Sequence, residues 1–64
     1  MAEVVDLSME IHHETAAALL LSDDGDRKNA VWIPKSQIED IDRSKEPIIE
    51  VSIPEWLAHK KGLI

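Results

Sequence analysis

Residues 5–11 alternate strictly between apolar and polar side chains, and no other feature constrains the fold of this chain as much. The apolar positions are Val5, Leu7, Met9 and Ile11, and the polar positions are Asp6, Ser8 and Glu10. Side chains on a β-strand point alternately to the two faces, so a period of two is typical of a strand buried on one face only. The pattern predicts a first strand with its apolar side on the core and its polar side in solvent.

Three further segments have β character. Residues 15–21 are apolar after Thr15, which favours a strand covered on both faces, although the alanines could also propagate a helix. Residues 29–33 and 48–53 also favour strands. Between the second and third strands, residues 22–26 read Ser-Asp-Asp-Gly-Asp, a sequence typical of a hairpin turn. Residues 34–43 predict a helical turn or an ordered loop.

The C-terminus predicts a short helix. Ser52 and Glu55 have the spacing of a capping box, in which the two side chains satisfy each other's free backbone amides. About eight residues do not form a stable helix alone, so the helix must dock on the sheet. We expect Trp56 to be its buried anchor, packed beside Leu57 or Leu63.

These elements predict a single domain over residues 1–64, mainly β with a short C-terminal helix. We expect four antiparallel strands in a small, strongly bent sheet, an SH3-like partial barrel; an open α+β meander is the alternative. A chain of this length buries only about 60% of its unfolded surface. Its expected stability is therefore only about 3–5 kcal/mol. Forming a homodimer would be an inexpensive way to add buried area.

Composition limits the class of protein. The chain is 44% hydrophobic and 31% charged and has no cysteine, which indicates a globular domain and suits a reducing compartment. No apolar run approaches the roughly 20 residues that span a bilayer. Met1-Ala2-Glu3 lacks the basic start of a signal peptide. We therefore expect a cytoplasmic protein without a membrane partner.

The net charge of −6 is unevenly distributed. Residues 1–28 hold seven acidic and two basic side chains, whereas residues 29–64 hold six and five. Nucleic-acid binders cluster lysine and arginine to neutralise phosphates, and here the bases are scattered. Nucleic acid is thus disfavoured as a partner. A basic protein fits an acid-rich half better, unless the acids serve solubility alone.

Two segments place a tryptophan beside an Ile-Pro pair: Val31-Trp32-Ile33-Pro34-Lys35-Ser36-Gln37 and Ile53-Pro54-Glu55-Trp56-Leu57-Ala58. In these segments and the closing Lys-Gly-Leu, the chain resembles a family of small uncharacterised proteins commonly encoded by phages and prophages. The resemblance covers about residues 10–64. It implies a compact stand-alone domain from a mobile element, acting in the host cytoplasm, and it implies no particular activity.

The sequence offers little for chemistry. His12 and His13 are adjacent, so on a regular strand they face opposite ways and cannot share one metal ion without a bulge. The Asp-rich turn lacks the late glutamate of an EF-hand calcium loop. Ser36 and His59 could meet only by folding, and the chain has no nucleophile elbow or glycine-rich phosphate loop. We expect no enzyme, no metal and no cofactor.

The candidate site is a partner-binding surface formed by Trp32, Lys35 and Gln37. Trp32 has the opposite strand parity to Val31 and Ile33, so we expect it to be partly exposed; the alternative is a second core tryptophan. Lys35 and Gln37 follow a proline and should lie on a polar recognition loop, unless Ser36 only caps a helical turn.

Two functional hypotheses follow. The first is a small acidic phage-type interaction module that binds and modulates a host or phage protein, such as a host defence or DNA-processing machine, because aromatic anchors dominate protein interfaces. The second is a nucleic-acid-binding accessory protein, because small bent sheets often bind strands by aromatic stacking.

Overall fold

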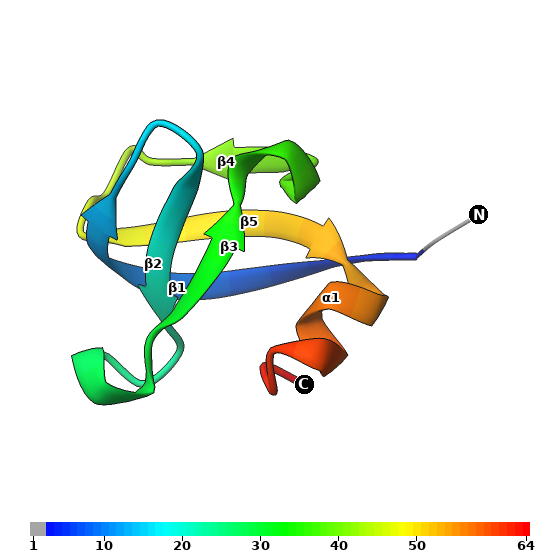
Figure 1. Ribbon diagram of the computed structural model, residues 1–64. Helices are drawn as coiled ribbons and strands as arrows, with labels where there is room; N and C mark the ends of the chain where they lie inside the picture. Colours follow the sequence, from blue (N-terminus) through cyan, green and yellow to red (C-terminus); the bar gives the residue numbers. More distant parts are fainter. Residues whose placement is uncertain (1–2) are drawn as a thin grey trace.

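The computed structural model describes residues 3–64, which form one five-stranded antiparallel sheet and a short C-terminal helix (Figure 1). The strand order is β3-β2-β1-β5-β4. The strands are β1 (Val4–Glu14), β2 (Ala18–Ser22), β3 (Val31–Pro34), β4 (Asp40–Asp42) and β5 (Ile48–Pro54), and the helices are the 3-10 turns η1 (Arg27–Asn29) and η2 (Lys35–Gln37) and the α-helix α1 (Glu55–Lys60).

The expected alternation in β1 is confirmed. Met9 is buried, and its apolar neighbours at every second position pack against the core. Asp6 and Ser8 are exposed, and Glu10 is half-buried on the same side. The core-facing residues of β1 pair with core-facing residues of β5, for example Leu7 opposite Val51. The fully enclosed core residues are Met9, Leu19, Leu21, Ile33, Ile49, Val51, Ile53, Leu57 and Ala58.

A β-bulge interrupts the pairing of β1 with β2. Ile11 lies opposite Leu21 and His13 lies opposite Leu20, which leaves His12 as the extra residue. One inserted residue exchanges the two faces for the rest of a strand. His13 therefore shares a face with Leu20, on the side of the sheet away from the core, which we call the outer face.

The Asp-rich segment forms the predicted turn in the loop from β2 to β3. Gly25 has a φ of +78°, a conformation that residues with a Cβ rarely adopt. The backbone amide of Asp26 donates to Asp24 Oδ1 over 2.9 Å. Asp26 Oδ1 in turn accepts from the amide of Lys28 at 2.9 Å and caps η1. The aspartates thus satisfy amides of the turn itself.

The expectation of four strands is wrong, because residues 40–42 form a fifth strand, β4, within the segment 34–43 that we had expected to be a helical turn or an ordered loop. Only η2 is helical in this region. Asp40, Ile41 and Asp42 pair with β5, and the amide of Glu39 donates to the carbonyl of Ser52 at 2.7 Å. Pairing with a strand distant in sequence thus overrides the local pattern.

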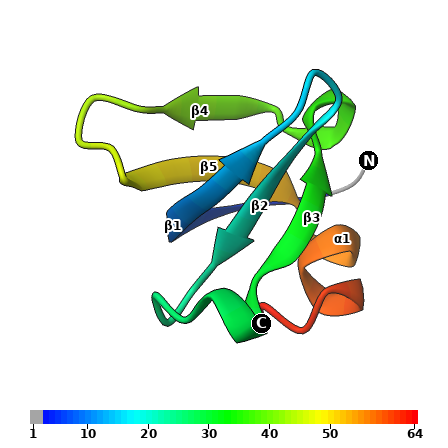
Figure 2. The same cartoon turned by 60° about the vertical axis from the view of Figure 1, so that its left-hand side comes forward.

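The sheet curves so that the end of β3 comes near the start of β4, although it is not a closed barrel (Figure 2). Five flat strands would set β3 and β4 about 19 Å apart, at about 4.8 Å for each neighbouring pair. The link from Pro34 to Asp40 includes η2, whose rise is only about 2 Å per residue, so it spans about 16 Å at most. Because this link is too short for the flat arrangement, the sheet has to curve.

The strand order also excludes the alternative of a simple meander, because β4 lies beside β5 and not beside β3.

The expected docking of the terminal helix through Trp56 is wrong. Trp56 is 50% exposed, whereas Leu57 and Ala58 are buried. Pro54, Leu57 and Ala58 have the i, i+3, i+4 spacing of one helix face, and Trp56 lies off that face. The large aromatic side chain is therefore left in solvent by its position on the helix.

The predicted capping box is also absent. The N-cap of α1 is Pro54, which has no side chain to accept from the free amides. The hydroxyl of Ser52 instead donates to Asp6 across the β1–β5 pair, because Ser52 is part of the strand.

Candidate functional site

Trp32 lies on the outer face of β3 with 42% of its surface exposed. Its neighbour Ile33 is fully buried on the opposite face, and Val31 packs against the core on that same side. The predicted partial exposure of Trp32 is confirmed. Strand parity was the signal that distinguished this tryptophan from a core residue.

Three side chains form a row across the outer face, and we call this row the Trp32 patch. Leu20 is paired with His13 on one side and with Trp32 on the other. The imidazole of His13 meets the Trp32 indole edge-on, with ring centroids 6.0 Å apart and an angle of 84° between the planes. Aromatic pairs favour this edge-to-face geometry. The patch thus presents a partly exposed indole that packs edge-on against His13.

The place of His13 in this patch depends on the bulge at His12. Without the extra residue, His13 would follow the parity of Ile11 and point to the core. The alternation of apolar and polar residues covers only residues 5–11 and ends before the bulge. The sequence pattern therefore could not show that His13 lies on the outer face. The only available signal was the adjacency of two histidines, which we had considered as metal ligands that would need a bulge to face the same way.

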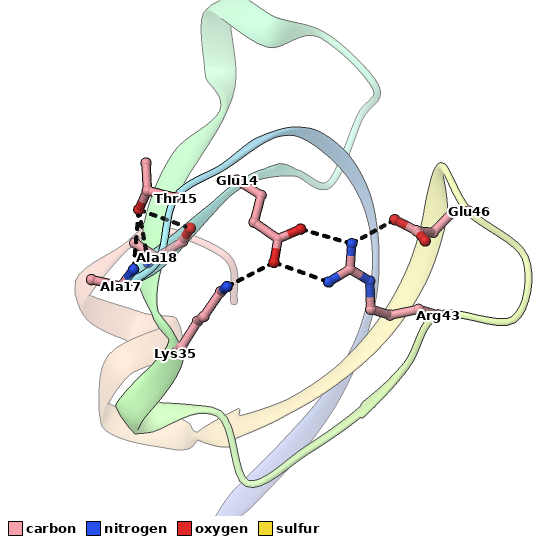
Figure 3. Close-up of polar contacts among 7 residues, drawn as sticks. All are labelled: Glu14, Thr15, Ala17, Ala18, Lys35, Arg43 and Glu46. Atoms are coloured by element: carbon pink, nitrogen blue, oxygen red, sulfur yellow. Dashed lines mark hydrogen bonds and ion pairs between the residues drawn. The ribbon is translucent and has the colours of Figure 1, made fainter.

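Lys35 lies in an ion-pair cluster with Glu14, Arg43 and Glu46 (Figure 3). Lys35 Nζ donates to Glu14 Oε2 at 2.7 Å. Arg43 approaches the same carboxylate with both terminal nitrogens, at 3.2 Å and 2.9 Å, and its Nη2 also donates to Glu46 at 2.7 Å. The cluster joins the end of β1, η2 and the loop after β4.

Hydrogen bonds from Arg43 and Lys35 lower the pKa of Glu14 to about 2. The same contacts with Glu14 and Glu46 raise the pKa of Arg43. Next to Glu14, Thr15 Oγ1 accepts from the amides of Ala17 and Ala18 at 3.3 Å and 3.1 Å and shapes the turn into β2 (Figure 3). This end of the sheet is therefore held by charge and by turn geometry together.

The three predicted site residues are not gathered into one patch. Trp32 contacts His13 on the outer face, whereas the ammonium of Lys35 is engaged by Glu14. Glu14 follows His13 directly and, beyond the bulge, has the core-side parity of its partner Leu19. Gln37 is half-buried in η2. Ser36 does not cap that turn, because Pro34 occupies the N-cap position without a side-chain hydrogen bond.

Acidic side chains occupy the outer face of the other three strands. Asp6 on β1 lies opposite Ser52 on β5, which lies opposite Asp40 on β4. In the next row, Ser8 lies opposite Glu50, and Glu50 lies opposite Asp42. We call these two rows the acidic rows. They border two shallow grooves that share Asp42 and Glu50.

A half-buried histidine, His12, lies beside the last residue of β2, Ser22. His12 Nε2 is 2.7 Å from the hydroxyl of Ser22, and Nδ1 is 3.6 Å from Glu10 Oε2. A serine, a histidine and an acid in this order resemble a catalytic triad. Ser22, however, is fully buried, and 3.6 Å is too long for an orienting hydrogen bond. The arrangement satisfies buried polar groups and offers no nucleophile to a substrate.

The remaining histidine lies on α1, where His59 Nε2 is 3.7 Å from Glu55 Oε1 in an exposed pair. Within residues 3–64, no three histidine or acidic side chains are grouped so that they could hold a metal ion. Over the same range, no helix has both the length and the apolar character needed to cross a membrane. Comparison of the chain with protein-family models, with curated proteins and with solved structures gave no match.

Proposed function

We propose that this protein is an interaction module that binds and modulates another protein through the Trp32 patch. The observation that carries the proposal is the 42% exposure of Trp32 on an ordered strand. Tryptophan is among the residues most enriched at the energetic centres of protein interfaces. A chain with only two aromatic side chains of the Phe, Trp and Tyr type places one of them on the outer face.

The geometry of the patch favours tight binding. The indole is supported by Leu20 beside it and by the edge-on ring of His13. A side chain that is already oriented loses little rotamer freedom on binding, which lowers the entropic cost of association. Trp32 therefore offers a partner a large apolar surface at low cost.

The same proposal includes a phage or prophage origin of the protein and an SH3-like shape of its sheet. The resemblance of the two tryptophan segments to phage and prophage proteins supports a mobile-element protein that acts in the host cytoplasm. One such role is inhibition of a defence or DNA-processing machine. The curved sheet is compatible with an SH3-like partial barrel, a shape that other small interaction modules use.

Nucleic-acid binding is the competing hypothesis. It needs cations beside the exposed aromatic side chain, so that the backbone phosphates are neutralised while a base stacks. The cation closest in sequence to Trp32 is Lys35, and its ammonium is paired with Glu14. Because the acidic rows occupy the same outer face, the arrangement favours a protein partner.

Affinity capture from a host-cell lysate tests the proposal with three baits: the natural chain, Trp32→Ala and Trp56→Ala. The last is a matched control, because Trp56 is equally large and 50% exposed but lies on α1. We expect a protein that the natural chain and Trp56→Ala both retain and that Trp32→Ala loses. Equal capture by all three folded baits, or recovery of nucleic acid in place of protein, would overturn the proposal.

A further inference from the structure

The outer face carries like charges in direct opposition. Asp42 and Glu50 are cross-strand partners in the β4–β5 pair. Directly opposed residues of an antiparallel pair bring their Cβ atoms within about 5.5 Å, and like charges at this spacing destabilise a sheet. Asp6 and Asp40 extend the same charge to the next row. The fold thus retains an unfavourable arrangement that solubility alone does not require.

Within the described residues, no ion pair neutralises the acidic rows. Among residues 3–64, the ion pairs involve Glu10, Glu14, Glu46 and Glu55, and none involves a member of the acidic rows. Lys45 lines one of the two grooves, and its charge lowers the pKa of Asp42 after the larger effect of hydrogen bonds from Ser44. Asp42 is therefore ionised at neutral pH, and among residues 3–64 its carboxylate forms no ion pair.

The acidic rows continue the Trp32 patch along β1. From His13 in the patch, the outer face passes Glu10, which lies opposite the exposed Ile48, and then reaches Ser8 and Asp6 in the acidic rows. An exposed aromatic side chain and a set of carboxylates without ion pairs among residues 3–64 thus lie on the same outer face of the sheet. Charge complementarity at the rim of an interface selects the partner and accelerates its approach.

We propose that the partner docks a lysine- or arginine-rich segment on the acidic rows while its apolar side chains cover the Trp32 patch. This inference rests on the proposed function and specifies the chemistry of its partner. Cations placed between Asp42 and Glu50 relieve the repulsion of that pair. The free energy of binding therefore includes the release of a repulsion that destabilises the free protein. The two grooves beside these residues provide places for the basic side chains.

Octa-arginine serves as the probe, and Trp32 serves as the reporter in a Trp56→Phe background that leaves a single indole. The test variant is Asp42→Asn with Glu50→Gln, and both replacements keep a side-chain oxygen. The matched control is Glu3→Gln with Glu55→Gln, which changes net charge equally but lies beside α1, where the Glu55 amide donates to the Glu3 carbonyl.

We expect the test variant to bind octa-arginine about three- to tenfold more weakly than the parent, the range for losing two exposed charge contacts. The control should stay within about twofold, and salt should weaken binding to the parent because exposed charges are screened within about 10 Å at 0.1 M. Equal weakening of test and control would show attraction to net charge alone and overturn the inference. Trp32-dependent capture from lysate would then still stand, so the two failures are distinguishable.

Discussion

Arg43 donates hydrogen bonds to the carboxylate of Glu14 from both terminal nitrogens of its guanidinium, at 2.9 Å and 3.2 Å. The two residues are far apart in sequence, and they tie the end of β1 to the loop after β4. Lys35 joins the same carboxylate from η2, which links the two edge strands. These ion pairs thus connect the two edges of the curved sheet, because Lys35 follows β3 and Arg43 follows β4.

This contact predicts a loss of stability in acid. The pKa of Glu14 falls from an ordinary 4.5 to about 2 in the folded protein, chiefly through hydrogen bonds from Arg43 and then Lys35. Because the folded pKa is depressed, the stabilisation is present above pH 4.5 and is lost as the pH falls toward 2. Glu14→Gln should therefore unfold at lower urea than the natural chain at pH 7 and at nearly the same urea at pH 2.

Urea titrations at several pH values between 7 and 2 check this prediction. Asp23→Asn is a suitable control, because Asp23 is exposed and has no ion pair among the described residues. A gap between Glu14→Gln and the natural chain that stays constant down to pH 2 would contradict the assigned role of Glu14.

Truncation of Leu57 should destabilise the protein much more than truncation of Trp56. Leu57 is 3% exposed, and Leu→Ala at such a site costs about 2–5 kcal/mol. That loss is comparable to the roughly 3–5 kcal/mol expected for a domain of this size. Leu57→Ala should unfold much of the protein, whereas Trp56→Ala should change the free energy of unfolding by less than about 1 kcal/mol. Circular dichroism during urea titration separates the two outcomes, and unfolding of Trp56→Ala would show that the indole supports the core.

The buried face of the terminal helix could be predicted from the sequence, although our expectation for Trp56 was wrong. Pro54, Leu57 and Ala58 have helical spacing in the sequence, so their burial was predictable. We gave more weight to the size of Trp56 than to its position. In β1, by contrast, period-two alternation identified the buried face correctly because every residue from 5 to 11 obeys it.

The other differences depend on contacts between distant segments. The three residues of β4 are too few for a periodic signal, and their strand conformation depends on pairing with β5. The bulge at His12 is defined only by its register against β2. The Trp32–His13 contact and the acidic rows follow from this pairing, so the composition of the outer face could not be derived from either half of the chain alone.

Removing the Ser22 hydroxyl should destabilise the protein. Ser22 is fully buried, and its hydroxyl lies 2.7 Å from His12 Nε2. Ser22→Ala leaves that ring nitrogen without its partner in a site of low exposure, which costs about 1–3 kcal/mol. Urea unfolding measures the change, and Ser8→Ala is a control at an exposed position of β1. Equal effects of the two substitutions would show that the His12–Ser22 contact contributes no stability.

The last prediction compares two neighbours on β3. Ile33→Ala removes a fully buried side chain and should cost about 2–5 kcal/mol, enough to unfold much of the domain. Trp32→Ala removes a larger side chain, yet the indole lies on the outer face with 42% of its surface exposed. Its loss also removes the contact with His13, and such an aromatic pair is worth about 0.5–1.5 kcal/mol.

Trp32→Ala should therefore keep a cooperative unfolding transition and a dispersed amide spectrum, with a modest decrease in the urea midpoint, while Ile33→Ala should lose both. The comparison also decides how the capture experiment is interpreted, because loss of a partner by Trp32→Ala has meaning only if the variant is folded. If Trp32→Ala melts as readily as Ile33→Ala, the indole supports the core from outside and the Trp32 patch cannot be treated as a surface free for a partner.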